Sequence, residues 1–175
     1  MFSAIVTTLL ALLVSDDDAD ALRSTAPTYL TVDTAREHLV AARLAAVATG
    51  TDADLLLSIA WHESRYQHDA VSQEAGGRVS CGIMTPTPVA RCPRGQTILG
   101  GYMAGAQHLR SWYDATGHQR AALLGFAGGY RAIRRCAQGP MYIRPGVDGC
   151  KTPEVFQHRA RWVRNARKRS TAPAS

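Results

Sequence analysis

The sequence predicts a mainly α protein with at most one small β-hairpin. Apolar residues recur at helical spacing in five segments that lie between residue 34 and residue 167. From residue 68 to residue 101 this period is lost, and glycine and proline dominate. The chain has 175 residues, of which 46% are hydrophobic, so it suits a single domain with an ordinary core.

The N-terminal part is expected to be a leader followed by a linker. Residues 2–14 form an apolar run of the size of a signal-peptide core, too short to span a bilayer, which takes about 20 residues. Residues 16–29 are small and polar and contain Pro27, so they are assigned to a linker. Export to the periplasm or outside the cell is therefore expected. Because no Lys or Arg precedes the run, an uncleaved leader or a disordered start remain alternatives.

The first two predicted helices flank Gly50. Asp33 can cap a helix over residues 34–49, and Gly50 can end it. Thr51 or Asp52 can then cap a second helix, which carries the sequence LLLSIAWHES. The folded domain is assigned to residues 30–168, and residues 169–175 to a disordered tail. The apolar stripe expected on the first helix consists of Leu39, Val40, Leu44 and Val47.

A carboxylate stands on the apolar face of the second helix. Glu63 follows Leu56, Ile59 and Ala60 at the spacing that gathers side chains on one helical face. Moving a carboxylate out of water is costly unless it is paired, or its pKa rises until it keeps its proton near neutral pH. A proton kept at neutral pH is what a general acid needs. The alternative is that Glu63, near the helix end, leans into water or pairs with Arg65.

The irregular region over residues 68–101 is long for a compact domain, and such regions are more often functional than structureless. A short hairpin is expected around residues 73–82. The four cysteines are even in number and widely spaced, which favours disulfides over a zinc site. Pairing Cys81 with Cys92 and Cys136 with Cys150 closes the shortest loops and is the pairing expected. Four buried thiols in a reduced protein are the alternative.

Three further helices are expected over residues 99–116, 118–135 and 153–167. The middle one contains a glycine run at residues 125–129, and each glycine costs about 1 kcal/mol relative to alanine inside a helix. Either a sugar chain or the helix that carries Glu63 is expected to approach the backbone there, and helix packing is the more conservative interpretation. The side chains expected to point inward are Tyr102, Ala106, Leu109, either Trp112 or Tyr113, Val155, Phe156, Ala160, Val163 and Ala166.

Three blocks of the sequence together resemble a known family. The first is Glu63-Ser64 with Tyr66 and residues 70–72, the second is Gly82-Ile83-Met84 with two following prolines, and the third is residues 122–129. Over residues 30–167, this pattern resembles the catalytic domain of soluble lytic transglycosylases. That family shares its fold with goose-type lysozymes, so the resemblance implies a lysozyme-like fold in which several helices surround a cleft.

The resemblance implies cleavage of the β-1,4 bond between N-acetylmuramic acid and N-acetylglucosamine in peptidoglycan. Glu63 matches the family's single catalytic glutamate, which protonates the leaving oxygen and then, as a base, activates the muramic acid's own 6-hydroxyl to give a 1,6-anhydro sugar. A hydrolytic muramidase with two carboxylates uses the second carboxylate to stabilise the oxocarbenium-like centre of the sugar or to activate water. The nearest candidates, Asp69 and Glu74, are assigned to a turn cap and a solvated loop. One carboxylate therefore favours the transglycosylase.

The residues expected to bind substrate keep structural alternatives. Ser64 either orients Glu63 or the substrate, or caps the helix end. Met84 either lines the cleft or fills the core. Aromatic faces suit sugars, but core packing is equally open for the aromatic residues of the set. Thr85 stands where the family usually has glutamine, and Phe126 with Ala127 where it has tyrosine and asparagine, so these departures concern the substrate contacts. The full expected set is Ser64, Ile83, Met84, Thr85, Tyr102, Phe126 and Tyr130.

No metal or organic cofactor is expected. His62 and His68 flank Glu63 along the chain, but their spacing does not place them on its face, so both are expected to be surface histidines.

The formal net charge of +6 implies an acidic or polyanionic partner. The basic segment over residues 159–169 could bind the phosphates of a nucleic acid, but no nucleic-acid-binding motif accompanies it. A monomer that acts on peptidoglycan glycan strands, with no nucleic-acid partner and no stable membrane span, is therefore expected. A hydrolytic muramidase of the same fold and an inactive wall-binding module remain the alternatives. Wall remodelling, service to a secretion system and phage lysis are all open.

Overall fold

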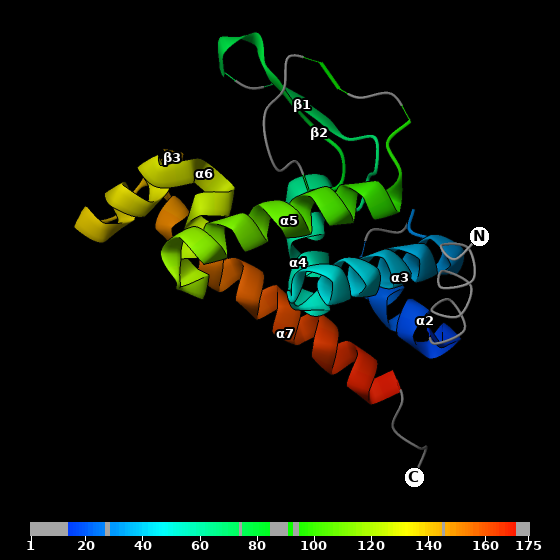
Figure 1. The fold of residues 1–175 in the computed structure, drawn as a ribbon. Helices are drawn as coiled ribbons and strands as arrows, with labels where there is room; N and C mark the ends of the chain where they lie inside the picture. The colour runs from blue at the N-terminus through cyan, green and yellow to red at the C-terminus, as the bar shows by residue number, and fades with distance from the viewer. Residues whose placement is uncertain are drawn as a thin grey trace.

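The structure is a computed structural model that describes residues 14–26, 29–73, 75–84, 91–92, 95–144 and 146–170. This part of the chain contains six α-helices and two short antiparallel strand pairs (Figure 1), which confirms the mainly α prediction. The helices are α2 (Asp16–Ser24), α3 (Val32–Thr49), α4 (Ala53–Ser64), α5 (Ile98–Thr116), α6 (Gln119–Gln138) and α7 (Thr152–Ser170). The strand pairs are β1 (Val71–Gln73) with β2 (Val79–Cys81) and β3 (Tyr142–Arg144) with β4 (Val147–Asp148).

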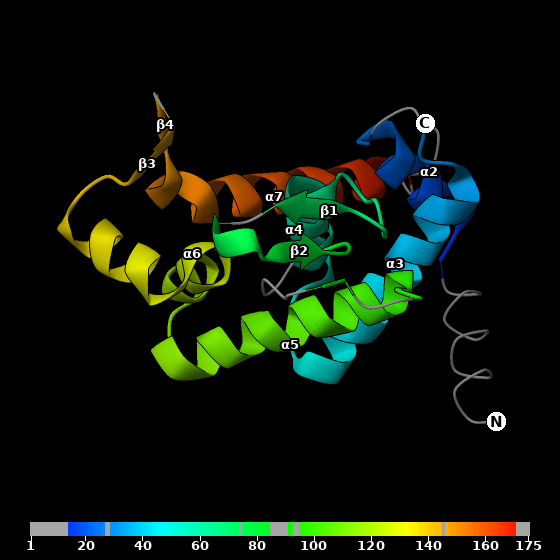
Figure 2. The ribbon, with the colours of Figure 1, turned by 90° about the horizontal axis from the view of Figure 1, so that it is seen from above.

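Helix α4 runs through the centre of the molecule. Helices α3 and α5 lie side by side next to it, and α7 crosses behind it (Figures 1 and 2). Leu56, Ile59 and Ala60 of α4 are fully buried, so the predicted apolar face of this helix lies in the core. The β1–β2 hairpin, with the short helix η1 (Ala75–Gly77) between its strands, projects beyond the C-terminal end of α4. The predicted hairpin is therefore confirmed, and it begins soon after the end of α4 that carries Glu63.

The helix ends follow local capping chemistry. Helix α3 is capped by Thr31, whose side chain accepts a hydrogen bond from the Thr34 backbone N–H, so the prediction of Asp33 as the cap was wrong. Gly50 ends α3 in the left-handed region, as predicted, with φ of 68°. Asp52 caps α4 by accepting from the Leu55 backbone N–H at 3.0 Å. Asp52, one of the two predicted caps, is thus the one used.

The prediction of a linker over residues 16–29 was wrong for most of that segment. Residues 16–24 form α2, which packs against α3 and α7 with Ala19 and Leu22 fully buried. Ser15 caps the helix, and three aspartates occupy its first turn, where the positive end of the helix dipole stabilises negative charge. The acidic cluster that suggested a solvated linker is the start of a helix.

The ends of the chain differ in part from the expectation. Helix α7 continues to Ser170, so Arg169 and Ser170 are helical instead of belonging to a tail. Residues 171–175 and nearly all of the apolar run at residues 2–14 lie outside the described residues. Among the described helices, none is both long and apolar enough to cross a membrane.

The predicted helical stripes are largely buried. Tyr102, Ala106 and Leu109 of α5 lie in the core, and of the two alternatives at the end of that stripe Trp112 is half-buried while Tyr113 is exposed. On α7, Phe156, Ala160, Val163 and Ala166 are buried as predicted. The prediction was wrong for Val47 and Val155, which are both exposed. Val155 stands at the edge of its stripe, and Val47 lies in the last turn of α3.

Both predicted disulfides are present. Cys81 is bonded to Cys92, and Cys136 is bonded to Cys150. The first fixes the end of β2, and the second joins α6 to η2 (Gly149–Lys151), just before α7. The β3–β4 pair lies in the segment between these two cysteines and was not expected from the sequence. Two disulfides are compatible with an exported protein.

Replacing Cys136 and Cys150 together by serine should lower the free energy of unfolding by about 3 kcal/mol, because the bond closes a 14-residue loop. Denaturant titration without a reductant measures the loss. Adding a reductant should then destabilise the wild type more than the variant, which has only one bond left to lose. Equal stability of the two proteins in oxidising buffer contradicts the prediction.

Candidate functional site

Glu63 lies in the last turn of α4 and is half-buried. The helix stops one residue later because Arg65 and Tyr66 both adopt positive φ, at 57° and 68°. The Arg65 backbone N–H donates to the Trp61 carbonyl at 3.1 Å, which closes the helix end. A positive φ at two successive residues with side chains is uncommon and stores backbone strain. The carboxyl group is thus held at a sharply ended helix whose buried face is apolar.

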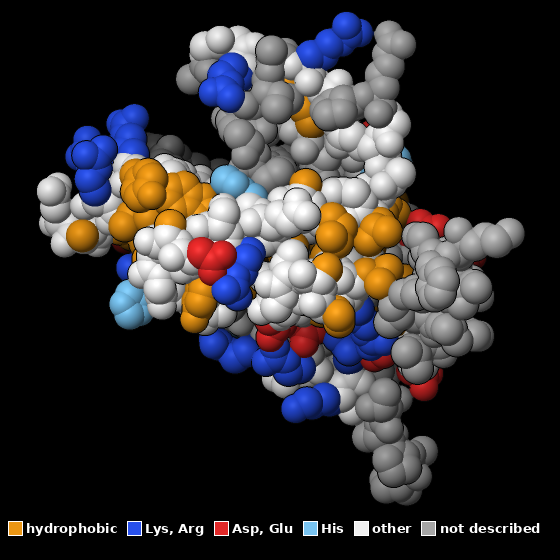
Figure 3. Space-filling model, viewed as in Figure 1, with side chains coloured by type: hydrophobic (Ala, Val, Ile, Leu, Met, Phe, Trp, Pro, Cys, Tyr) orange, Lys and Arg blue, Asp and Glu red, His pale blue; other side chains and the backbone are white. Residues whose placement is uncertain are grey.

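The surface is hollowed on the side of the molecule where the hairpin rises. In Figure 1, β1 and β2 lie beyond the C-terminal end of α4, above α5. Part of α6 also lies above α5, apart from the hairpin. The space-filling view shows a hollow between the hairpin and α6, with Lys or Arg side chains on both of its rims (Figure 3). A half-buried carboxyl and a basic-rimmed hollow therefore lie at the same end of α4.

A buried aromatic cluster supports the turn after α4. His38 of α3 lies in the centre, with its Nδ1 atom 3.1 Å from the Tyr102 hydroxyl and its ring centroid 5.0 Å from that of Tyr66. Burial lowers the pKa of His38 to about 4 and raises the pKa of Tyr66 to about 12. The Arg159 guanidinium lies 3.9 Å from the centroid of the Trp61 ring, and the Arg65 guanidinium lies 4.5 Å from it. At neutral pH this support contains a neutral histidine, and two guanidinium cations lie against its Trp61 ring.

The buried histidine predicts acid sensitivity of the fold. The pKa of His38 is about 4 in the folded chain and near 6.5 when exposed, so the unfolded chain binds the extra proton more readily. This stabilisation is complete above pH 6.5 and is lost as the pH falls from there towards 4. Lowering the pH from 7 to about 4.5 should remove about 2 kcal/mol through His38 alone.

The measurement is the free energy of unfolding as a function of pH. His38→Gln should make the acid slope shallower, and the matched control His158→Gln, at an exposed position of α7, should leave it unchanged. Burial and the charges of Arg65 and Arg159 also lower the pKa of His62 to about 4, so some slope should remain in the His38 variant. An unaltered slope in His38→Gln contradicts the assignment.

Most of the expected substrate-binding residues lie in the core. Ile83, Met84 and Tyr102 have no solvent exposure, so their side chains support the site from below and do not reach its surface. Ser64 is buried and donates to the Ala60 carbonyl at 3.0 Å, which matches the helix-end alternative. Thr85 lies outside the described residues.

Sequence reasoning missed the glycines that make this packing possible. An ideal Cβ atom on Gly105 would lie 2.5 Å from the Met84 sulfur, and one on Gly101 would lie 3.2 Å from the Ile83 Cβ. Alanine at position 105 would clash with Met84, and alanine at position 101 would require Ile83 to shift slightly, so α5 approaches this segment closely. The spacing of the two glycines, on one face of a predicted helix, was the available signal.

A second aromatic cluster lies between α5 and α6. Trp112 packs edge-on against Tyr130, with ring centroids 4.8 Å apart, and its Nε1–H donates to His108 Nε2 at 3.2 Å. Phe126 is nearly buried, and its ring lies 5.4 Å from that of His108. Tyr130 is 63% exposed. Of the expected aromatic substrate residues, Tyr130 is the one that presents its ring to solvent.

The same contacts explain the glycine run. An ideal Cβ atom on Gly125 would lie 2.4 Å from ring atoms of Trp112, so the group that approaches this backbone is a tryptophan of α5. From the sequence, either a sugar chain or the helix that carries Glu63 was expected to approach this backbone, and both expectations were wrong for Gly125. Gly128 and Gly129 depart from helical geometry, with φ of 64° at Gly129, and divide α6 into two parts.

The remaining polar residues of the region are placed as follows. Asp69 is exposed, and Glu74 lies outside the described residues. His68 is exposed as expected, whereas His62 is half-buried with its ring 5.3 Å from that of Phe156. No group of three or more His, Cys, Asp or Glu side chains that could hold a metal occurs in the part of the chain that the structure describes.

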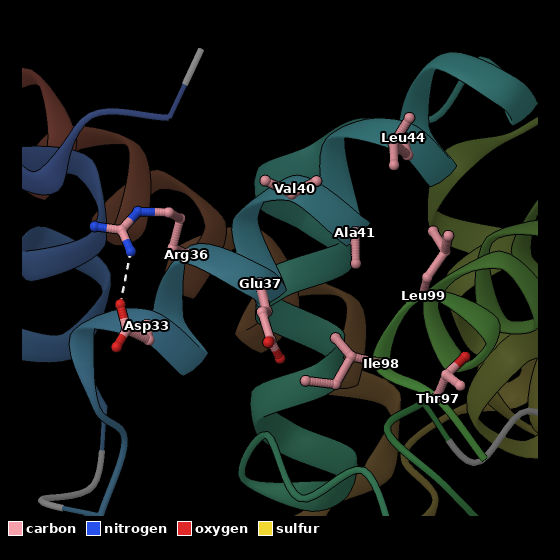
Figure 4. A pocket seen from close by; sticks show the side chains of 9 residues that line it. All are labelled: Asp33, Arg36, Glu37, Val40, Ala41, Leu44, Thr97, Ile98 and Leu99. Carbon is pink, nitrogen blue, oxygen red and sulfur yellow. Dashed lines mark hydrogen bonds and ion pairs between the residues drawn. The ribbon is translucent and has the colours of Figure 1, made fainter. Parts of the chain in front are cut away.

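A separate cavity lies between α3 and the start of α5 (Figure 4). It has a volume of about 510 Å³ and contains none of the predicted site residues in its lining. Val40, Ala41 and Leu44 line it from α3, and Ile98 and Leu99 from α5. At one end of it, Arg36 forms ion pairs with Asp33 and with Asp16 of α2. The Glu37 carboxyl also lies in its lining, near Ile98 (Figure 4).

Compared with protein-family models, curated proteins and solved structures, the chain has no match.

Proposed function

We propose that the chain is an exported lytic transglycosylase that cleaves peptidoglycan glycan strands, with Glu63 as acid and then base. The observation that carries the proposal is the position of Glu63. Its carboxyl is half-buried in the last turn of α4, on the face whose other members are fully buried apolar residues, and the adjoining surface is hollowed. The sequence blocks that resemble the family lie around this helix end and supply the substrate class.

The helix end and two uncharged histidines favour an acid at this position, whereas the two arginines near His62 act in the opposite direction. The C-terminal end of a helix carries partial negative charge, which disfavours a second negative charge next to it. His62 is uncharged at neutral pH, because burial and two neighbouring arginines lower its pKa to about 4. His38, which lies beneath the turn, is also uncharged at neutral pH, because burial lowers its pKa to about 4. Neither histidine therefore supplies a cation that would hold Glu63 as a carboxylate.

The proposed reaction needs one carboxyl group and no cofactor. Protonated Glu63 gives its proton to the glycosidic oxygen while the bond from that oxygen to C1 of the muramic acid breaks. The resulting carboxylate takes the proton of the 6-hydroxyl, and O6 forms the new bond to C1. Glu63 ends protonated, no water is consumed, and the product is a 1,6-anhydro ring.

The nucleic-acid alternative loses its best argument in the structure of α7. Arg164 pairs with Asp52 and Asp54, and Arg167 pairs with Asp18 and Asp54. Arg159 stacks on tryptophan rings. Three of the basic side chains of this helix are thus used to hold the fold together.

Mass spectrometry of the sugars released by the wild-type chain from purified peptidoglycan tests the proposal. Anhydromuramic ends are expected. Reducing ends that are one water heavier would instead indicate a hydrolytic muramidase of the same site. If a folded chain binds peptidoglycan and releases nothing, the enzyme proposal is overturned in favour of a wall-binding module.

A further inference from the structure

The second half of α6 presents an arginine cluster with no carboxylate partner. Arg131, Arg134 and Arg135 are exposed and surround, with Gln138, a hollow of about 230 Å³. None of the three arginines forms an ion pair with a carboxylate of the described residues, whereas Arg36, Arg43, Arg110, Arg120, Arg164 and Arg167 all do.

This arrangement works against the stability of the helix. The spacings from Arg131 to Arg134 and to Arg135 are those at which side chains on one helical face meet, and like charges at these spacings repel. A partner that brings negative charge relieves the repulsion. Guanidinium groups bind carboxylates through paired, charge-assisted hydrogen bonds, so the hollow suits such groups.

The cluster is held rigidly at one side of the surface hollow. Gly128 and Gly129 break α6, and its second half runs outward, away from α5 (Figures 1 and 2). The disulfide from Cys136 to Cys150 ties this half to the start of α7. Tyr130, whose exposed ring precedes Arg131 directly, contacts Trp112 at the inner end of the segment. An exposed aromatic ring followed by fixed cations forms a continuous surface along α6.

We propose that Arg131, Arg134 and Arg135 bind the carboxylates of the peptide stems that peptidoglycan carries. This inference rests on the proposed function for its substrate. Each muramic acid that enters the site can bring a stem attached to the same sugar ring, so the anion arrives with the glycan and needs no separate partner. The arginines would select strands that still carry stems and fix their direction along α6.

The test is a binding measurement without turnover. A chain carrying Glu63→Gln is compared with the same chain carrying Arg131→Glu and Arg134→Glu in addition, on sacculi free of teichoic acid. One sample keeps its stems, and the other has been stripped of them by an amidase, after which the lactyl carboxylates that the cleavage exposes are converted to neutral methylamides. The charge reversal should weaken binding to stem-bearing strands by about tenfold at low salt, and less at high salt because screening shortens the range of the attraction. Binding to stripped strands should change little.

The matched control reverses two exposed arginines of α7, Arg161→Glu and Arg169→Glu, which changes the net charge equally. It should leave the difference between the two samples intact. Equal weakening by the control, equal weakening on stripped strands, or no weakening at all each overturns the proposal. Binding is measured without cleavage, so the two proposals fail separately. A wild-type chain that releases no anhydro sugars refutes the enzyme proposal, whereas the binding measurement still decides whether the arginines bind stems.

Discussion

Replacing Glu63 by glutamine is expected to lower the rate of glycan cleavage by about three orders of magnitude, the scale on which a positioned general acid contributes. The amide has the size of the carboxyl group but no proton to give at neutral pH. Because Glu63 is half-buried at the end of α4, the exchange keeps the packing of Leu56, Ile59 and Ala60 beneath it. The melting temperature should therefore change little while the release of anhydro sugars stops.

The control for this variant is Asp69→Asn, which removes one carboxylate from the exposed segment after α4. Its activity should stay within about twofold of the wild type, because the proposed reaction uses a single carboxyl group and Asp69 lies exposed beyond the end of α4. A Glu63→Gln chain that keeps more than a tenth of the wild-type rate contradicts the assignment. An inactive Asp69→Asn chain would point to a second carboxylate and therefore to the hydrolytic mechanism.

The sequence predicted the helical face that carries Glu63 better than it predicted the exposure of the residues expected to bind substrate. Glu63 could be placed because helical spacing fixes which residues share a face, and its neighbours on that face are indeed buried. Ile83, Met84 and Tyr102 were expected near the substrate, but they are fully buried. Spacing cannot separate a side chain that lines a hollow from one directly below it, because the difference depends on how closely other elements approach. Here the close approach is made by α5 at Gly101 and Gly105.

The fold was predicted where the signal is local. Helical periodicity and short loop closure led to the long helices and to both disulfides. Helix α2 was missed because its stability depends on partners far away in the chain. Asp18 forms ion pairs with Arg43 of α3 and Arg167 of α7, separated from it by 25 and 149 residues. A run of acidic residues can be identified as a helix start only when those partners are known.

These ion pairs form a cluster that joins four helices at the end of α4 opposite Glu63. Arg167 of α7 reaches Asp18 of α2 at 3.1 Å and Asp54 of α4 at 2.5 Å. Arg43 of α3 reaches Asp18 at 2.7 Å, and Arg164 reaches Asp54 at 2.9 Å. The side chain of Asp54 is only 10% exposed, so its charge is compensated by protein groups more than by water. Breaking a buried pair by removing one partner costs more than the pair itself contributes, because the other charge stays behind.

Asp54→Asn is therefore expected to lower the free energy of unfolding by about 3 to 5 kcal/mol, since it leaves two arginines short of a partner in a poorly solvated cluster. Denaturant titration measures the loss. The matched control is Asp52→Asn, which removes the same charge from the neighbouring acid but keeps the cap of α4, because asparagine caps as well as aspartate. Asp52 is 46% exposed and, among the described residues, pairs with Arg164, so its loss should cost at most about 1 kcal/mol.

The double variant Arg167→Gln with Asp54→Asn should cost clearly less than the sum of the two single changes. Each single change leaves the other charge without its partner, whereas the double variant removes both charges. Equal losses at Asp52 and Asp54 would mean that water compensates both charges, and that the anchoring of α2 and α7 to the site helix comes from apolar packing instead.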